Sequence, residues 1–169
     1  TRFQALDVVR WETRVVPIDG VAGIDGLYTR ISEVLDGLRS VAQGRDVVCR
    51  LTLTGRGPMH KELKRGDATG GLTDELRSGA LSSSPWIWIE RISDRTRPEL
   101  DLEARARQDD FLGALLKRGA DAGPEAFEDA LAGVFSGRRD RLPLASEADM
   151  KEWKEEARWY LAELLEPEG

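Results

Sequence analysis

The chain has 169 residues, of which 40% are hydrophobic and 33% are charged, a composition that excludes a disordered protein and favours a globular one. No apolar run approaches the roughly 18–20 residues that span a bilayer, and a single cysteine, Cys49, excludes a disulfide within the chain. We therefore expect a cytoplasmic protein of one domain, or one domain with an appendage. Because the chain begins with Thr1 rather than Met, we interpret it as a fragment.

The net charge of −6 is spread unevenly along the chain. Residues 1–97 carry 15 Lys and Arg against 13 Asp and Glu, whereas residues 98–169 carry 10 against 18. Such asymmetry predicts two parts with different partners, divided between residues 97 and 98. The acidic second part is better suited to a protein partner than to nucleic acid.

The first part begins with the pattern of a strand, a helix and a second strand. In Val8–Ile18, charged residues alternate with Trp11, Thr13 and Val15, and we expect these three to form the buried face. Residues 24–41 have the hydrophobic spacing of an amphipathic helix. Residues 47–54 alternate again as a strand. Together they predict a β-α-β unit, which is usually parallel and right-handed.

A third strand and a helical region follow. Residues 55–84 are rich in Gly and Ser with two short helical patterns, and residues 85–93 predict a strand that is apolar on both faces and therefore central. Helices are expected over residues 102–118, from Pro124 onward, and from about residue 146 to residue 166. The predicted fold is α/β (α+β), with a small mixed sheet containing the β-α-β unit and a helical C-terminal extension.

Large hydrophobic side chains in the helical extension are candidates for contact with a partner. Taking about 100° per residue, the last helix has an apolar stripe from Met150 to Leu164, and Trp159 points away from it. A large aromatic on that side either marks a contact surface or is covered by another part of the same chain. The partner-contact candidates are Phe111, Leu115 and Trp159.

The residues predict no complete catalytic site. His60 is the one histidine, so an imidazole-based two-metal centre lacks ligands, and we interpret His60 as a loop or capping residue. Cys49 lies among strand-forming residues and is expected to be a small buried side chain. The loop at residues 55–60 departs from a dinucleotide fingerprint, because it lacks the third glycine and contains Pro58. We therefore expect neither enzyme activity nor a bound cofactor in this chain.

Basic residues cluster after the second and third strands. If the strands are parallel, their ends lie at one edge of the sheet, and the cations can form one positive patch for DNA phosphates. The alternative is a solvated loop balanced by Glu62, Asp67 and Asp94. The DNA-contact candidates are Arg56, His60, Lys61, Lys64, Arg65, Arg91, Arg95 and Arg97.

The order of several short motifs resembles the C-terminal region of bacterial SbcD-like DNA repair exonucleases, in particular the branch described as YhaO-like. The resemblance covers most of the chain and is clearest from Arg10 to Pro98. It is carried by Asp7-Val8-Val9-Arg10-Trp11, Arg50-Leu51-Thr52-Leu53-Thr54-Gly55-Arg56, Met59-His60, Trp86-Ile87-Trp88-Ile89-Glu90 and Thr96-Arg97-Pro98.

The resemblance implies a division of labour. In such proteins an upstream metallophosphoesterase domain holds two metal ions, typically manganese, and cuts DNA. A capping domain then positions the DNA, and later helices dock onto a coiled-coil SbcC-like ATPase. Residues 1–97 would be the capping-type domain and residues 98–169 the docking region, with manganese only in the upstream domain. The alternative is a stand-alone protein-interaction domain without a DNA role; the oligomeric state stays open.

Overall fold

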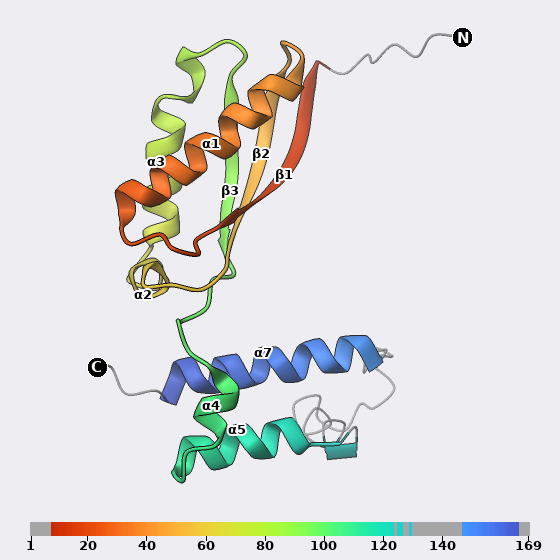
Figure 1. Cartoon of the computed structure of the whole chain (residues 1–169). Coiled ribbons are helices and arrows are strands. Elements are labelled where there is room, and N and C mark those ends of the chain that lie inside the picture. The colour runs from red at the N-terminus through yellow and green to blue at the C-terminus, as the bar shows by residue number, and fades with distance from the viewer. Residues whose placement is uncertain (1–7, 124, 127–128, 130–146, 166–169) are drawn as a thin grey trace. The chain divides into compact units, whose positions relative to one another are not determined.

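The computed structural model describes residues 8–123, 125–126, 129 and 147–165. The chain divides into two compact units, residues 1–99 and residues 100–169 (Figure 1). Each unit has its own hydrophobic core. The described part contains no helix that is both long and apolar enough to cross a membrane.

The first unit is built on a parallel three-stranded sheet. Strands β1 (Val9–Pro17), β2 (Asp46–Thr54) and β3 (Ile87–Asp94) lie in the order β1-β2-β3, and both pairings are parallel. Helix α1 (Ile24–Ala42) joins β1 to β2 and completes the predicted β-α-β unit. The α/β class is confirmed. The sheet is parallel in both described pairings rather than mixed, and β2, not β3, is its central strand.

The core of this unit lies on one face of the sheet. Four alternate residues of β2 are fully buried, and they pack in one cluster with the hydrophobic residues of α1 that recur at three- and four-residue steps. Such spacing places those α1 residues on one side of the helix. The buried residues of these two elements are Val47, Cys49, Leu51, Leu53, Leu27, Ile31, Leu35, Leu38 and Ala42.

Three short helical segments connect β2 to β3: α2 (Met59–Leu63), α3 (Ala68–Ser78) and the 3-10 turn η1 (Ala80–Ser82). Helix α3 begins at Asp67, whose carboxylate accepts a hydrogen bond from the backbone N–H of Gly70 at 3.0 Å. This cap satisfies one of the amides that a helix N-terminus leaves without a partner. Met59, Leu63 and Leu72 join the core of the unit.

The predicted face of β1 is wrong. Trp11 is 63% exposed and Val15 is also exposed, whereas Val16 and Ile18 are fully buried. The side chains of Arg10, Glu12 and Arg14 therefore share the covered face, and Arg10 donates a hydrogen bond to the carbonyl oxygen of Val41 on α1 at 3.2 Å. A period of two defines two faces of a strand but does not say which one is buried.

The second unit contains α4 (Leu102–Ala106), α5 (Phe111–Asp121) and α7 (Glu147–Leu165). The continuous helix predicted for residues 102–118 is thus broken. Asp110 is the reason, since its carboxylate accepts a hydrogen bond from the backbone N–H of Gly113 at 2.8 Å and starts a new helix. The helix expected from Pro124 onward begins outside the described residues.

Trp159 is the large aromatic side chain in the core of the second unit. It is 4% exposed and packs with Leu102, Leu112, Leu116 and Ala162. The hypothesis that Trp159 is a partner contact is therefore wrong, and the alternative, that the same chain covers it, holds. The apolar stripe predicted for the last helix is likewise not its buried face, because two of its members, Tyr160 and Leu164, are exposed.

We predict that Trp159→Ala destabilises the second unit by about 3–5 kcal/mol, because the substitution removes a large buried side chain and leaves a cavity. Urea denaturation followed by circular dichroism measures the change. Tyr160→Ala is the matched control: Tyr160 is 66% exposed on the same helix, and its loss should change stability by about 0.5 kcal/mol or less. Equal effects of the two substitutions would contradict the packing described here.

Candidate nucleic-acid interface

The ends of β2 and β3 lie side by side and carry basic residues onto one edge of the sheet. Beyond the strands, Arg56 and Arg97 form a further parallel bridge. The backbone N–H of Arg95 donates to the carbonyl of Leu53 at 2.9 Å, and that of Arg97 donates to Gly55 at 2.9 Å. The main chain thus fixes the positions from which Arg56, Arg95 and Arg97 project.

Helix α2 adds further cations beside this edge. Lys61 is exposed on α2, and Lys64 and Arg65 are exposed directly after it. The ammonium of Lys64 lies 3.6 Å from a carboxylate oxygen of Asp94 at the end of β3, which ties the α2 segment to the strand ends. We call this group the basic edge; it consists of Arg56, Lys61, Lys64, Arg65, Arg95 and Arg97.

A close approach of two loops shapes the turn that begins the basic edge. Gly55 has a φ of +93°, and a Cβ built on it would lie 2.2 Å from a carboxylate oxygen of Asp19. Only glycine adopts this backbone without strain and leaves that space. The carboxylate of Asp19 also accepts a hydrogen bond from the backbone N–H of Arg56 at 3.2 Å. The loop after β1 therefore holds the loop after β2.

His60 is not an exposed loop residue, and the proposal that it contacts DNA is wrong in this structure. It is 3% exposed, and its Nδ1 lies 2.9 Å from the hydroxyl oxygen of Thr96. The Thr96 hydroxyl donates to the carboxylate of Asp94 at 2.6 Å, and a hydroxyl has one proton to donate. His60 Nδ1 is therefore the donor to Thr96, and the three residues tie α2 to the end of β3.

Arg91 also lies apart from the basic edge. It is paired with Arg50 within the β2–β3 ladder, several residues before the strand ends, and its guanidinium lies 3.9 Å from the carboxylate of Glu90. Arg91 was grouped with the cations that follow the third strand, although it lies inside both the predicted strand, residues 85–93, and the observed strand β3. A register shift between Cys49 and Arg50 changes which β3 residues face which β2 residues.

The thiol of Cys49 is fully buried in the core, as the sequence predicted. Burial raises the pKa of Cys49 from its ordinary value of 9.0 to about 11, because a thiolate loses solvation there. A thiol with such a pKa is almost entirely protonated at neutral pH, and the thiolate is the reactive form.

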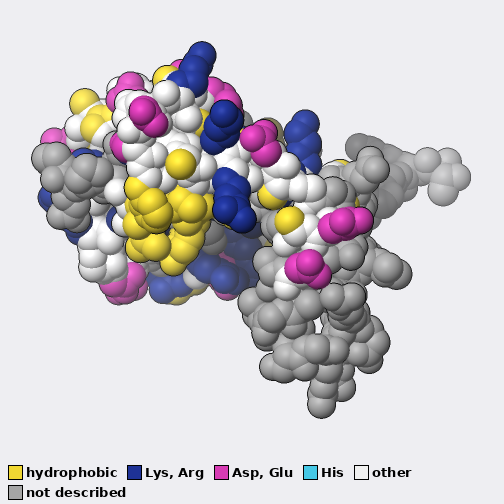
Figure 2. All heavy atoms as spheres, turned by 90° about the horizontal axis from the view of Figure 1, so that it is seen from below, with side chains coloured by type: hydrophobic (Ala, Val, Ile, Leu, Met, Phe, Trp, Pro, Cys, Tyr) yellow, Lys and Arg dark blue, Asp and Glu magenta, His cyan; other side chains and the backbone are white. Residues whose placement is uncertain are grey.

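The second unit also has exposed hydrophobic residues. Phe111 is 72% exposed at the start of α5, while Leu115 is half-buried. Figure 2 shows the face on the α5 side, where hydrophobic side chains form one patch with separate Lys and Arg side chains around it. Of the three partner-contact candidates, Phe111 and Leu115 remain accessible and Trp159 does not.

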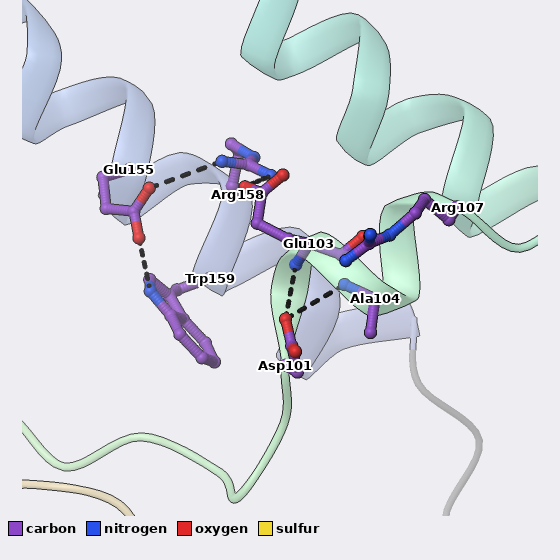
Figure 3. A network of polar contacts seen from close by, with 7 residues as sticks. All are labelled: Asp101, Glu103, Ala104, Arg107, Glu155, Arg158 and Trp159. Carbon is purple, nitrogen blue, oxygen red and sulfur yellow. Dashed lines mark hydrogen bonds and ion pairs between the residues drawn. The ribbon is translucent and has the colours of Figure 1, made fainter.

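A buried arginine, Arg158, organises the polar contacts of the second unit, and no pattern in the sequence predicts its burial. Arg158 donates to the carboxylate of Glu103 at 2.7 Å and lies 3.5 Å from Glu155, which in turn accepts from the indole N–H of Trp159 at 3.0 Å (Figure 3). Asp101 caps α4 through the backbone N–H groups of Glu103 and Ala104. These contacts tie α7 to α4.

Asp110 and Arg105 form a second such contact between α4 and α5. The side chain of Arg105 is nearly buried and donates to the carboxylate of Asp110 at 2.9 Å. That hydrogen bond, together with the one from the Gly113 backbone, lowers the pKa of Asp110 below its ordinary value. Asp110 therefore caps α5 and at the same time holds Arg105 of α4.

The described residues contain no group of three or more His, Cys, Asp and Glu side chains placed to hold a metal ion. What they contain is a small parallel α/β unit with a basic edge, followed by a separate helical unit.

Residues 11–97 match the family described as "Metallophosphoesterase YhaO, middle domain", and the chain belongs to this family. The match runs from β1 to the bridge between Arg56 and Arg97 and so spans nearly all of the first unit. The family agrees with the YhaO-like part of the resemblance. The matched part is a middle domain rather than a C-terminal region, and the match does not extend to residues 98–169. No curated protein and no solved structure matches the chain.

We predict that Thr96→Val destabilises the first unit by about 1–3 kcal/mol, because it leaves the buried His60 Nδ1 without its acceptor. Urea denaturation measures the loss. Thr13→Val is the control, since Thr13 is an exposed residue of β1 and should change stability by about 0.5 kcal/mol or less. A Thr96→Val protein as stable as the wild type would show that the His60 contact contributes nothing.

We also predict that Cys49 reacts with a disulfide reagent at about pH 8 far more slowly in the folded protein than in urea, because the folded thiol is both buried and protonated. Because the pKa of Cys49 is higher in the folded than in the unfolded chain, burial of the neutral thiol contributes to the free energy of unfolding. This contribution is fully present below the unfolded pKa of about 9 and is lost as the pH rises toward 11. Absorbance of the released reagent measures the rate. Rapid and complete labelling of the native chain would contradict this.

Proposed function

We propose that this chain is a non-catalytic module of a metallophosphoesterase that acts on DNA, and that its first unit positions DNA through the basic edge. The observation that carries the proposal is the bridge between Arg56 and Arg97, which places cations from two strand ends at one edge of the sheet. Cations held on a rigid main chain contact phosphates without regard to sequence. Such contacts orient a DNA end for a cutting site supplied elsewhere.

The charges around the basic edge support this assignment over a self-neutralised loop. Asp94 lies against Lys64 and also accepts from Thr96, and Asp67 caps α3, so both carboxylates have structural partners within the protein. Glu62 is an exposed carboxylate of α2 itself. Lys61, Arg65 and Arg95 are exposed beside them, and the balance of charge at this edge is positive.

The second unit is proposed to dock an SbcC-like coiled-coil ATPase. The acidic character of residues 98–169 and the exposed Phe111 suit a protein partner with basic and hydrophobic groups. In this proposal any manganese belongs to an upstream nuclease domain. A second candidate function, an interaction domain without a DNA role, is favoured by the same hydrophobic surface and differs in predicting no DNA binding.

We predict that the chain binds a short labelled DNA duplex at low salt, with affinity that falls steeply as salt rises because cations replace counterions on the phosphates. The double variant Lys61→Ala/Arg65→Ala should bind more weakly and show a salt slope smaller by roughly two, about one for each lost phosphate contact. Fluorescence anisotropy over a salt series measures both quantities.

The matched control is Arg39→Ala/Arg45→Ala, which removes the same charge near the opposite end of the sheet, where α1 ends and β2 begins. This variant should retain most of the affinity and the full salt slope. Equal losses in the two variants would mean that net charge, not the basic edge, binds DNA. No binding at low salt would leave the interaction-domain alternative.

A further inference from the structure

No described helix of the first unit covers the second face of the sheet, whose β1 side chains Trp11 and Val15 are exposed. The ladder aligns Trp11 of β1 with Val48 of β2, and Val48 with Trp88 of β3. Residues paired in this way point to the same side of a sheet. Their side is opposite to that of Cys49, which is in the core. Trp11 is 63% exposed and Trp88 is partly exposed, so an aromatic row crosses the open face.

Trp11 and Trp88 lie on either side of Val48, one on each outer strand of the sheet. Trp11 and Trp88 are two strands apart, which corresponds to roughly 10 Å between their backbones. The guanidinium of Arg50 lies 5.4 Å from the ring centroid of Trp11, and that of Arg77 lies 5.1 Å from that of Trp88. Each contact is within cation–π range and limits the movement of the ring.

The same face carries an excess of positive charge. Arg50 and Arg91 are paired across the ladder and are both exposed, and the carboxylate of Glu90 accepts from Arg50 at 2.7 Å. Arg77 from α3 donates to the backbone carbonyl oxygens of β3 and lies 3.6 Å from the carboxylate of Asp74. Three guanidinium groups thus accompany two carboxylates, those of Glu90 and Asp74. A purely apolar partner would have to remove water from these charges at considerable cost. An anion that also has flat apolar surfaces would compensate these charges while its apolar parts pack on the tryptophan rings.

An irregularity in the sheet supports a role for this face. The register shift places both Glu90 and Arg91 beside Arg50, where a regular ladder would place one residue. Such bulges re-aim side chains and occur often next to functional sites. Here the shift places Arg91 opposite Arg50, on the same face as the two tryptophans. Arg91 also lies on β3, the strand that ends just before Arg95 of the basic edge.

We propose that this open face binds single-stranded nucleic acid, with bases stacked on Trp11 and Trp88 and phosphates in contact with Arg50 and Arg91. Single strands offer both an unpaired aromatic face at each base and a negative backbone, which is the combination that aromatic and basic protein surfaces recognise. A duplex offers only the phosphates. The inference goes beyond the proposed function, because that function needs only phosphate contacts at the basic edge, although both take DNA as the ligand.

The test uses fluorescence anisotropy of the full chain with a labelled oligothymidine, an abasic strand of equal length and a duplex. The wild type should prefer oligothymidine to the abasic strand. Trp11→Ala should weaken oligothymidine binding by about five- to a hundredfold, the effect of losing one base–aromatic stack, and should leave abasic and duplex binding unchanged. Trp11→Phe should keep most of the affinity.

The control for Trp11→Ala is Leu81→Ala, which truncates a large hydrophobic side chain that is 67% exposed in the same unit. It should change no affinity. Oligothymidine binding that is unaffected by Trp11→Ala, or abasic binding as tight as that of oligothymidine, would overturn the inference. If Lys61→Ala/Arg65→Ala still weakens duplex binding in that case, the proposed function survives without it. A wild type that binds none of the three ligands at low salt would overturn both.

Discussion

The burial of one face of β2 against α1 is the constraint on which the rest of the first unit depends. Val47, Cys49, Leu51 and Leu53 are all fully buried on that face, and each such aliphatic side chain contributes roughly 1.5–3 kcal/mol. Because α1 must return from the end of β1 to the start of β2, the strands are parallel, and their ends are brought to one edge. A three-stranded sheet covered on one face leaves the other available, so both candidate surfaces follow from the same packing.

The sequence predicted β2 and α1 well, because alternation and helical spacing there agree with burial. For β1 the alternation correctly predicts a strand, but the wrong face was expected to be buried. The large side chain of Trp11 suggests that its face is buried, whereas Val16 and Ile18 on the other face reach the core. Trp159 was misplaced for a related reason. Helix α7 carries aromatic residues on several sides, so its sequence does not decide which side is buried. The stripe from Met150 to Leu164 is one of several faces that could pack against the rest of the unit.

For the candidate site, the positions of the basic residues along the sequence predicted most of the cations at the sheet edge. They did not predict which residues from distant parts of the chain contact one another there. His60 and Thr96 are 36 positions apart, and nothing in the sequence near either residue indicates that they share a buried hydrogen bond. The buried Arg158 was invisible for the same reason, since its partner Glu103 lies 55 positions away. Arg91 lies inside the strand predicted for residues 85–93, but its pairing with Arg50 required knowledge of the register shift, and pairing irregularities leave no reliable trace in a single chain's pattern.

The contact between Asp19 and Gly55 has a consequence for how the module moves. The carboxylate fills the space above the glycine and holds the amide of Arg56, so the two loops form a single mechanical piece rather than two independent flaps. The amide of Arg56 is thus held by Asp19 of the loop after β1, and Arg56 is in turn bridged to Arg97. The position of Arg56 therefore depends on the loop after β1 as well as on the end of β2.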